Sequence, residues 1–441
     1  MAAVFGHQSP TTSCTAWTEM EKASIDTDKL SYEIFSILES KFLFGYDDEN
    51  NLWIPKQVNS DVDGVGAKRG KVCILSIDGG GGGMRGILPG KALAHLEKVL
   101  KAKSGNPNAR ISDFFDIAAG TGVGGIFTAM LFATNDKTCS IYSAEDTWRF
   151  VAENGKRFSG KKGGILGKMF KSAAHEGSSG LEKSMREAFR GLTLKDTLKP
   201  VLIPCYDMHS SAPFLFSRAD ALETDGFDFR LWEVCCATSA EPGVFDPVLL
   251  SSVDGQTQCL AVDGCLAMSN PTAAAITHVL HNKQEFPFVR GVEDLLVLSL
   301  GTGQLMELTH DYEQIKGWKA KEWVRPMARI AGDGSAESVD QAVAMAFGSR
   351  RSSNYVRIQA NGSNMGRSKS GTKAKAVMEM AEEMLKQKNV ESVLFGGKTI
   401  SDMNNAEKLE WFAGELVLEH QRRSCGRSPA VAVKQAPRRA S

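Results

Sequence analysis

Two glycine-rich turns, each placed between an apolar run and a helical stretch, constrain the fold of this chain more than any other feature. The first turn, at residues 78–86, follows the apolar run Val72–Ile77 and precedes a helical stretch at 87–103. The second, at 120–125, follows an apolar run at 114–118 and precedes a helical stretch at 126–133. A buried strand, a tight turn and a helix in that order are typical of a parallel sheet covered by its crossover helices.

The rest of the chain repeats this alternation of strand and helix. Helical stretches near 181–189, 231–239 and 271–281 separate further apolar runs. These strand candidates lie at 200–205, 214–217, 259–262 and 295–300. We therefore expect an α/β fold with a central, largely parallel sheet between layers of helices.

Composition excludes several classes of protein. Lysine plus arginine equals aspartate plus glutamate at 52 each among 441 residues, so no net charge draws the chain to nucleic acid, and we expect no nucleic-acid partner. The nine cysteines include no Cys-x-x-Cys pair, and several have apolar neighbours that indicate buried free thiols: Cys73, Cys205, Cys235, Cys236 and Cys259. No run is apolar over the length that a membrane span requires. We expect a cytoplasmic protein that contacts membranes, such as the plasma membrane, only peripherally.

The first turn is suited to binding an anion. Glycine lets the backbone approach a substrate closely, and backbone NH groups at a helix N-terminus stabilise negative charge. A dinucleotide-binding fingerprint fits Gly81, Gly83 and Gly86 by spacing, but residues 101–110 lack the acidic residue that it requires. A phosphate-binding P-loop fails because Ala92 stands where a serine or threonine is needed. An oxyanion site and a purely structural bend remain as the two interpretations.

The second turn has the spacing of a nucleophile elbow, the sharp strand-to-helix turn that exposes a catalytic residue. Gly120 and Gly124 are the small flanking residues, but Gly122 stands at the central position, where a serine is expected. No Gly-x-Ser-x-Gly sequence exists elsewhere in the chain. A glycine-rich packing turn is the alternative interpretation.

A third element provides a carboxylate. Asp263 follows an apolar run and precedes Gly264. A carboxylate at the end of a buried strand is a candidate general base, although an isolated Asp-Gly pair also forms ordinary turns. The histidines show no spacing typical of metal ligands, so we expect neither a metal nor another cofactor.

Together, the three elements resemble the patatin-like phospholipase family over residues 72–303. The Asp-Gly-Gly-Gly-x-Arg-Gly motif of the family matches residues 78–86 with two additional glycines, and its nucleophile motif matches residues 120–124. Its Asp-Gly motif matches Asp263 and Gly264, and supporting segments match at 237–242, 270–272 and 299–303. The resemblance implies a three-layer α/β fold and calcium-independent, phospholipase A type hydrolysis of lipid acyl esters by a serine–aspartate dyad.

The resemblance also implies roles for single residues. Asp263 would be the general base, and the NH groups of Gly82 and Gly83 would form the oxyanion hole. The other motif positions are Gly81, Arg85, Gly86, Gly120, Gly124 and Gly264. Glycine at 122 departs from the serine of the family and resembles a plant subgroup regarded as lipid acyl hydrolases of broad specificity, acting on phospholipids and galactolipids.

Gly122 has no side chain with which to form an acyl-enzyme. Hydrolysis then requires another attacking group, and we expect a water molecule that Asp263 deprotonates in the space of the missing serine side chain. The alternative is a catalytically impaired pseudoenzyme that binds lipid or acyl groups and acts through partners. Fatty-acid release that is lost in Asp263→Ala separates the two hypotheses.

Composition divides the chain around this core. We expect a disordered N-terminus at 1–27 and a helical extension at 28–70, followed by the acyl-hydrolase core at 71–303. A helical C-terminal extension at 304–420 and a basic disordered tail at 421–441 complete the chain.

One segment of the core, at 156–171, interleaves cations with apolar side chains and contains no acid. This composition is typical of a surface that binds an anionic membrane, and an ordinary solvated loop is the alternative. The residues predicted to contact the membrane are Lys161, Lys162, Ile165, Leu166, Lys168 and Phe170. Membrane lipid, as substrate or ligand, is therefore the expected partner.

Overall fold

The computed structural model describes residues 70–80, 83–154, 173–303, 312–348, 351–361, 373–393, 397–424 and 431. The chain divides into two compact units, Met1–Ala67 and Lys68–Ser441, and every described residue belongs to the second. The predicted N-terminus at 1–27 lies outside the described residues, and so does the predicted helical extension at 28–70 apart from residue 70. The same is true of the predicted membrane-contact residues Lys161, Lys162, Ile165, Leu166, Lys168 and Phe170.

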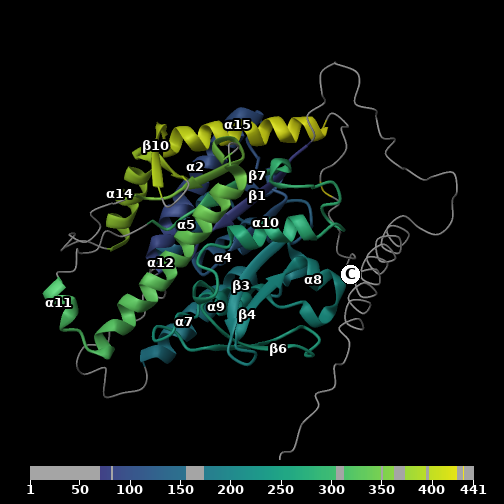
Figure 1. The fold of residues 1–441 in the computed structure, drawn as a ribbon. Helices are drawn as coiled ribbons and strands as arrows, with labels where there is room; N and C mark the ends of the chain where they lie inside the picture. The colour runs from purple at the N-terminus through teal and green to yellow at the C-terminus, as the bar shows by residue number, and fades with distance from the viewer. Residues whose placement is uncertain are drawn as a thin grey trace, which may run out of the picture. The chain divides into compact units, whose positions relative to one another are not determined.

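The centre of the second unit is an eight-stranded sheet with the order β5-β6-β3-β2-β1-β7-β8, in which β4 pairs with β3 (Figure 1). Its parallel part consists of β3 (Val201–Asp207), β2 (Ile117–Gly120), β1 (Val72–Ile77), β7 (Leu295–Leu300) and β8 (Tyr355–Ile358). Antiparallel pairs add β4 (Ala212–Ser217), β5 (Val248–Ser251) and β6 (Gln258–Val262) beside β3. The sheet is largely parallel, as predicted.

Side chains of the parallel strands alternate between two apolar cores, one on each face of the sheet. In β1, Leu75 and Ile77 pack into the larger core, whereas Val72 and Ile74 pack into the smaller one. The larger core is covered by α2 (Ile87–Ser104), α4 (Val123–Phe132), α9 (Leu231–Thr238), α14 (Lys373–Lys386) and α15 (Asn405–Ser424). The smaller core is covered by α10 (Thr272–His281) and α12 (Ala320–Phe347). This arrangement confirms the predicted three-layer α/β fold.

The remaining elements connect these layers or lie at their margins. The helices are α3 (Ile111–Phe114), α5 (Ala144–Glu153), α7 (Ala173–Phe189), α8 (Arg218–Glu223), α11 (Tyr312–Lys316) and α13 (Arg351–Asn354). The 3-10 turns are η1 (Gly83–Gly86), η3 (Leu194–Asp196), η4 (Asp225–Phe227), η5 (Gly264–Leu266) and η6 (Val292–Asp294). Two further strands, β9 (Lys388–Val393) and β10 (Gly397–Asn404), form a separate antiparallel pair.

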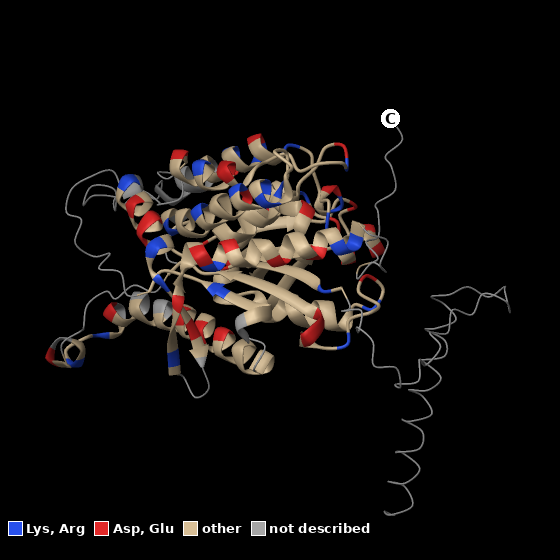
Figure 2. Ribbon diagram, turned by 90° about the horizontal axis from the view of Figure 1, so that it is seen from above, with Lys and Arg blue, Asp and Glu red and all other residues tan. Residues whose placement is uncertain are grey.

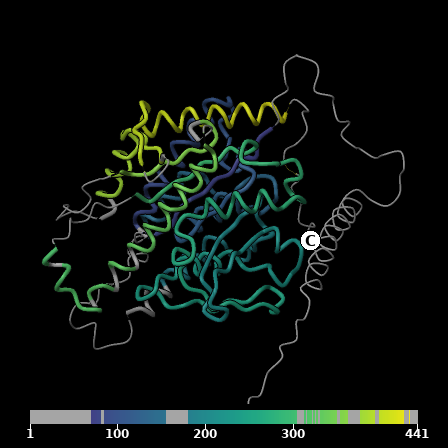
Figure 3. The backbone as a smooth tube through the Cα atoms, viewed as in Figure 1, coloured from purple at the N-terminus to yellow at the C-terminus, as the bar shows by residue number. Residues whose placement is uncertain are grey.

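The region beyond residue 303 takes part in the sheet as well as adding helices. Its strand β8 pairs in parallel with β7, so the sheet continues across the predicted boundary at 303. The predicted helical extension at 304–420 contains α12, α14 and α15, and α15 lies along α2 (Figure 3). The disordered tail was predicted to begin at 421, but α15 continues to Ser424. Its last turn is held because Arg423 binds the buried Asp116 with an Nη1–Oδ1 distance of 2.6 Å.

The described part of the chain carries both signs of charge without segregation. Figure 2 shows Lys and Arg interspersed with Asp and Glu over the helices. No described helix has the length and hydropathy to cross a membrane. Cys73, Cys205, Cys235, Cys236 and Cys259 are free and buried, as predicted.

Candidate active site

The two glycine turns meet at one edge of the sheet because the strands before them are parallel neighbours. Ile77, the last residue of β1, is the register partner of Gly120, the last residue of β2. The first turn then leads into η1 and α2, and the second into α4. Adjacent carboxyl ends of parallel strands are the usual location of a binding site in α/β sheets.

The second turn has the backbone geometry of a nucleophile elbow. Gly122, between β2 and α4, has φ +52° and ψ −125°, a conformation that residues with a side chain rarely adopt. Its flanking glycines are sterically required, since a Cβ at Gly120 would lie 2.2 Å from the Gly124 carbonyl oxygen, and one at Gly124 would lie 2.2 Å from the Ile77 carbonyl oxygen. The NH of Gly122 donates to Thr238 Oγ1 at 3.0 Å, which fixes the turn.

Asp263 faces the central position of this elbow. A Cβ built on Gly122 would lie 3.7 Å from Asp263 Oδ1, so a side chain at 122 would point toward the carboxylate. Asp263 is held by two backbone contacts: its NH donates to the Ala240 carbonyl at 3.0 Å, and its Oδ1 accepts from the NH of Cys265 at 2.9 Å. The structure thus brings together two residues that lie far apart in the sequence.

The Asp263 carboxylate is buried, with 9% of its surface exposed. Burial raises its pKa to about 6, opposed by hydrogen bonds from Cys265 and assisted by the charge of Glu241. A carboxylate with that pKa is ionised at neutral pH and accepts a proton more readily than an ordinary aspartate does. This is the property that a general base requires.

The first turn packs directly against the elbow. A Cβ at Gly79 would lie 2.4 Å from the Thr121 carbonyl oxygen, and a Cβ at Gly86 would lie 2.3 Å from Val123 Cγ1. Gly83 begins η1, and Arg85 within it is buried, at 8% exposure. Gly81 and Gly82 lie outside the described residues, so the oxyanion hole assigned to Gly82 and Gly83 stays a prediction.

Cys265 is a residue of this site that the sequence motifs did not indicate. Its Sγ lies 3.0 Å from a Cβ built on Gly122 and 2.5 Å from one built on Gly79. Thr121 Oγ1 donates to the sulfur at 3.8 Å. The thiol therefore lies between the first glycine turn and the elbow. The available signal was its position two residues after Asp263.

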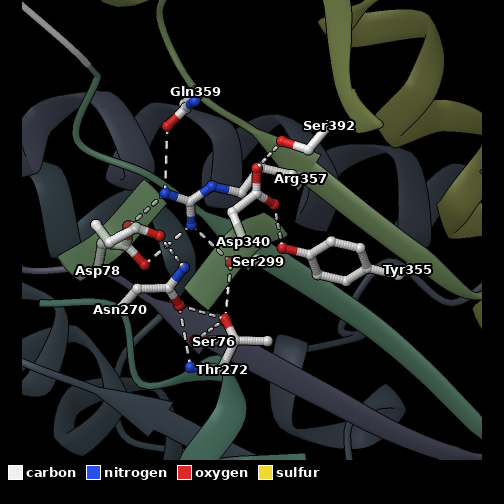
Figure 4. A network of polar contacts seen from close by, with 11 residues as sticks. Ser76, Asp78, Asn270, Thr272, Ser299, Asp340, Tyr355, Arg357, Gln359 and Ser392 are labelled. Carbon is white, nitrogen blue, oxygen red and sulfur yellow. Dashed lines mark hydrogen bonds and ion pairs between the residues drawn. The ribbon is translucent and has the colours of Figure 1, made fainter. Parts of the chain in front are cut away.

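A buried ion pair anchors the first turn from below. Arg357 of β8 donates from Nη1 to Asp78 Oδ1 at 3.0 Å and from Nη2 to Asp78 Oδ2 at 2.5 Å (Figure 4). Its Nη1 also donates to Ser299 Oγ at 2.6 Å, and its Nη2 to Gln359 Oε1 at 3.2 Å. Burial lowers the pKa of Arg357, but the facing Asp78 carboxylate outweighs this and leaves the pKa raised. The bidentate geometry is that of a charged pair.

The network continues to the segment after Asp263. Ser299 Oγ contacts Thr272 Oγ1 at 2.9 Å, and Thr272 in turn donates to Ser76 Oγ at 2.8 Å (Figure 4). The NH of Thr272 donates to Asn270 Oδ1 at 3.0 Å. Strands β1, β7 and β8 and the start of α10 are thereby linked beneath the site. Sequence motifs indicated residues 270–272 and 299–303, but they gave no indication of Arg357.

Comparison with known proteins identifies the family. Patatin-like protein 7 of Arabidopsis thaliana is 66% identical over 433 residues, which cover 96% of this chain and 87% of that protein. The chain belongs to the patatin-like phospholipase family. The patatin-like phospholipase domain itself matches residues 80–276, which include Gly122 and Asp263. Membership places the chain among lipid hydrolases at the level of the family.

One relative in this family has a name that bears on activity. The probable inactive patatin-like protein 9 of Arabidopsis thaliana is 42% identical over 399 residues, which cover 89% of this patatin-like chain and 93% of that protein. The crystal structure of VipD from Legionella pneumophila covers 72% of this chain and 67% of that chain, with a TM-score of 0.28 and 10% identity.

The described residues contain no cluster of His, Cys, Asp and Glu that is suited to hold a metal ion.

Proposed function

We propose that this protein hydrolyses the acyl ester bonds of membrane lipids, phospholipids and galactolipids alike, in a calcium-independent, phospholipase A type reaction. The observation that carries the proposal is the distance of 3.7 Å from Asp263 Oδ1 to a Cβ built on Gly122. It means that a nucleophile-elbow backbone faces a buried carboxylate with a raised pKa. A turn that serves only packing does not require a buried carboxylate whose ionised form is unfavourable in the folded state.

In this reaction Asp263 accepts the proton of the attacking group and later returns it to the leaving alcohol. The backbone NH groups of Gly82 and Gly83 stabilise the oxyanion that forms on the ester carbonyl. The ion pair between Asp78 and Arg357 fixes the start of the turn that carries these donors. Positioning of this kind lets donors act without reorganising as charge develops.

Exposed apolar side chains beside the site support action at a lipid surface. Leu266 follows Cys265 in η5 and is 54% exposed. Met327 and Ile330 of α12 are 63% and 62% exposed. α12 contacts η5 and is joined to the segment after Asp263 by a hydrogen bond from Asn270 Nδ2 to the Ala336 carbonyl at 3.3 Å. Leu266, three residues after Asp263, suits contact with lipid chains, and Met327 and Ile330 would extend this apolar surface along α12.

We propose a cytoplasmic protein that binds membranes such as the plasma membrane peripherally. The contact would be made by Leu266, Met327 and Ile330 and by the predicted membrane-contact residues Lys161, Lys162, Ile165, Leu166, Lys168 and Phe170. Each lysine near an anionic surface contributes about 1 kcal/mol to binding. Replacing Lys161, Lys162 and Lys168 by glutamine should weaken sedimentation with anionic vesicles, with neutral vesicles as control. Unchanged sedimentation would remove the basic segment from the proposal.

The proposed activity is tested with purified full-length protein and vesicles of phosphatidylcholine or galactolipid in the presence of a calcium chelator. We expect fatty-acid release by the wild type and loss of most of that release in Asp263→Asn, which keeps the size and the hydrogen-bond acceptor of the side chain. Equal rates for the two proteins would refute the role of Asp263.

The second candidate function is a lipid-binding protein without turnover. It is favoured by the absence of a side chain at Gly122 and by the name of the 42% identical relative, a probable inactive patatin-like protein. Vesicle binding without fatty-acid release, in both the wild type and Asp263→Asn, would support it.

A further inference from the structure

We propose that the thiol of Cys265 supplies the nucleophile that Gly122 lacks. The inference rests on the lipid acyl hydrolase activity proposed above and concerns the same site. Attack by the sulfur would restore a covalent acyl-enzyme, which the glycine at 122 cannot form by itself.

The sulfur of Cys265 occupies the space at the centre of the elbow. Its distance of 3.0 Å from a Cβ built on Gly122 places it where a serine side chain at 122 would extend. The same sulfur lies 2.5 Å from a Cβ built on Gly79, so both glycines leave room that the thiol fills. The attacking water expected from the sequence would have to share this space with the sulfur.

A base lies beside the sulfur. Asp263 Oδ1 lies 3.7 Å from the same Cβ built on Gly122 and accepts a hydrogen bond from the NH of Cys265 at 2.9 Å. Base, sulfur and elbow therefore converge on one point. A nucleophile within reach of a base that is itself held by backbone contacts is the arrangement shared by covalent hydrolases.

Cys265 also differs from the other described cysteines. Cys73, Cys205, Cys235, Cys236 and Cys259 are buried, and Cys139 is exposed. The residue Cys265 as a whole has intermediate exposure while its sulfur is buried against Gly79 and Gly122, and it is the described cysteine that adjoins both the elbow and Asp263. For attack on this sulfur, the ester carbonyl must enter between the first glycine turn and the elbow.

The thiol needs the base. Burial, and next the charge of Asp263, raise the pKa of Cys265 above its ordinary value, so the sulfur is protonated at neutral pH. The S–H proton must then pass to Asp263 as the S–C bond forms. The thiol therefore requires a general base, as a serine hydroxyl does, whereas a preformed thiolate would not.

The steps balance without any oxidant or other reagent. The sulfur adds to the ester carbonyl carbon while its proton moves to the Asp263 carboxylate, and the oxyanion forms at the glycine turn. The C–O bond then breaks, and the leaving alcohol takes the proton from Asp263, which leaves a thioester. Water, deprotonated by Asp263, attacks the thioester, and the thiol recovers its proton as the fatty acid leaves.

The test uses full-length protein and phosphatidylcholine vesicles with an isotopically labelled acyl chain, quenched in acid during turnover. We expect the acyl group on the peptide that contains Cys265, and its release by neutral hydroxylamine, which cleaves thioesters and leaves oxygen esters intact. Cys265→Ala should lose the adduct and about a hundredfold or more of the rate. Cys139→Ala should behave as the wild type.

Folding is controlled with Cys265→Ser, which nearly keeps the volume of the side chain. We expect it to melt with the wild type and to hydrolyse at least about tenfold more slowly, because a hydroxyl is the poorer nucleophile. If Cys265→Ala hydrolyses as fast as the wild type while Asp263→Asn does not, the thiol proposal is refuted and the proposed function stands. If the wild type releases no fatty acid, both fail.

Discussion

Replacing Asp263 by asparagine should stabilise the protein at neutral pH while abolishing hydrolysis. Asparagine is neutral at every pH, has nearly the same shape, and retains an Oδ1 that accepts the hydrogen bond from the NH of Cys265. The substitution therefore removes a buried charge and leaves the surrounding contacts in place. Loss of activity is expected because an amide does not accept the proton of the attacking group.

The size of the effect is set by the pKa. The pKa of Asp263 is about 6 in the folded chain against 3.8 for an ordinary aspartate. Since one pKa unit corresponds to about 1.4 kcal/mol, the ionised carboxylate costs the folded state about 3 kcal/mol. A raised pKa means that the folded state binds the proton more tightly. Its contribution to stability is complete below pH 3.8 and is lost as the pH rises through about 6.

Thermal melts at several pH values measure this. An unfolding entropy of about 2.1 cal/mol/K per residue over the roughly 370 residues of Lys68–Ser441 amounts to about 0.8 kcal/mol/K. The variant should then melt about 4 °C above the wild type at pH 8 and with it at pH 3.5. Asp402→Asn, at an exposed position of β10, is the matched control. A variant that melts below the wild type at pH 8 would refute the claim that the buried charge is unfavourable.

Three further predictions concern the same region. Arg357→Met leaves Asp78 buried without its partner and should lower the free energy of unfolding by about 3–5 kcal/mol in a urea titration, while Arg149→Met at an exposed helix position should change it little. The rate of lipid hydrolysis should rise with pH through about 6, where Asp263 becomes ionised; a rate that falls over this range would contradict the role of a base. Gly122→Ser should gain little activity alone, because its Cβ would lie 3.0 Å from Cys265 Sγ, and more when combined with Cys265→Gly; a large gain from the single substitution would show that the sulfur does not occupy the space.

Much of the fold could be predicted because its signals are local. The apolar run Val72–Ile77 and the glycines after it specify a buried strand and a turn without reference to distant residues. Alternation of strands with helices then predicts a parallel sheet, and a parallel sheet places successive turns at one edge. The proximity of Asp263 to Gly122 was accessible only through the family resemblance, because no periodic pattern connects positions so far apart in the sequence.

The residues that were missed depend on contacts between distant segments. Arg357 binds Asp78 across 279 positions, and its surroundings in the sequence resemble any short strand. The sequence pattern after residue 303 predicted helices, so β8, which has only four residues and supplies this arginine, was not predicted. Cys265 could not be predicted as part of the site, since the distance from its sulfur to Gly122 is a property of the folded backbone.

The two carboxylates at this edge of the sheet, Asp78 and Asp263, are both buried but have different partners. Asp78 is buried against Arg357, which donates to both of its oxygens, so its charge is compensated and its position is fixed. Asp263 is buried beside a backbone NH and a thiol, and the neighbouring charge that acts on it, Glu241, is also negative. Its ionised form is therefore unfavourable and ready to take a proton. Burial raises the pKa of both carboxyl groups, but at Asp78 the Arg357 guanidinium opposes the rise, whereas at Asp263 the charge of Glu241 adds to it. The difference between them is therefore the compensating cation, and we expect Asp78 to hold the turn and Asp263 to take part in proton transfer.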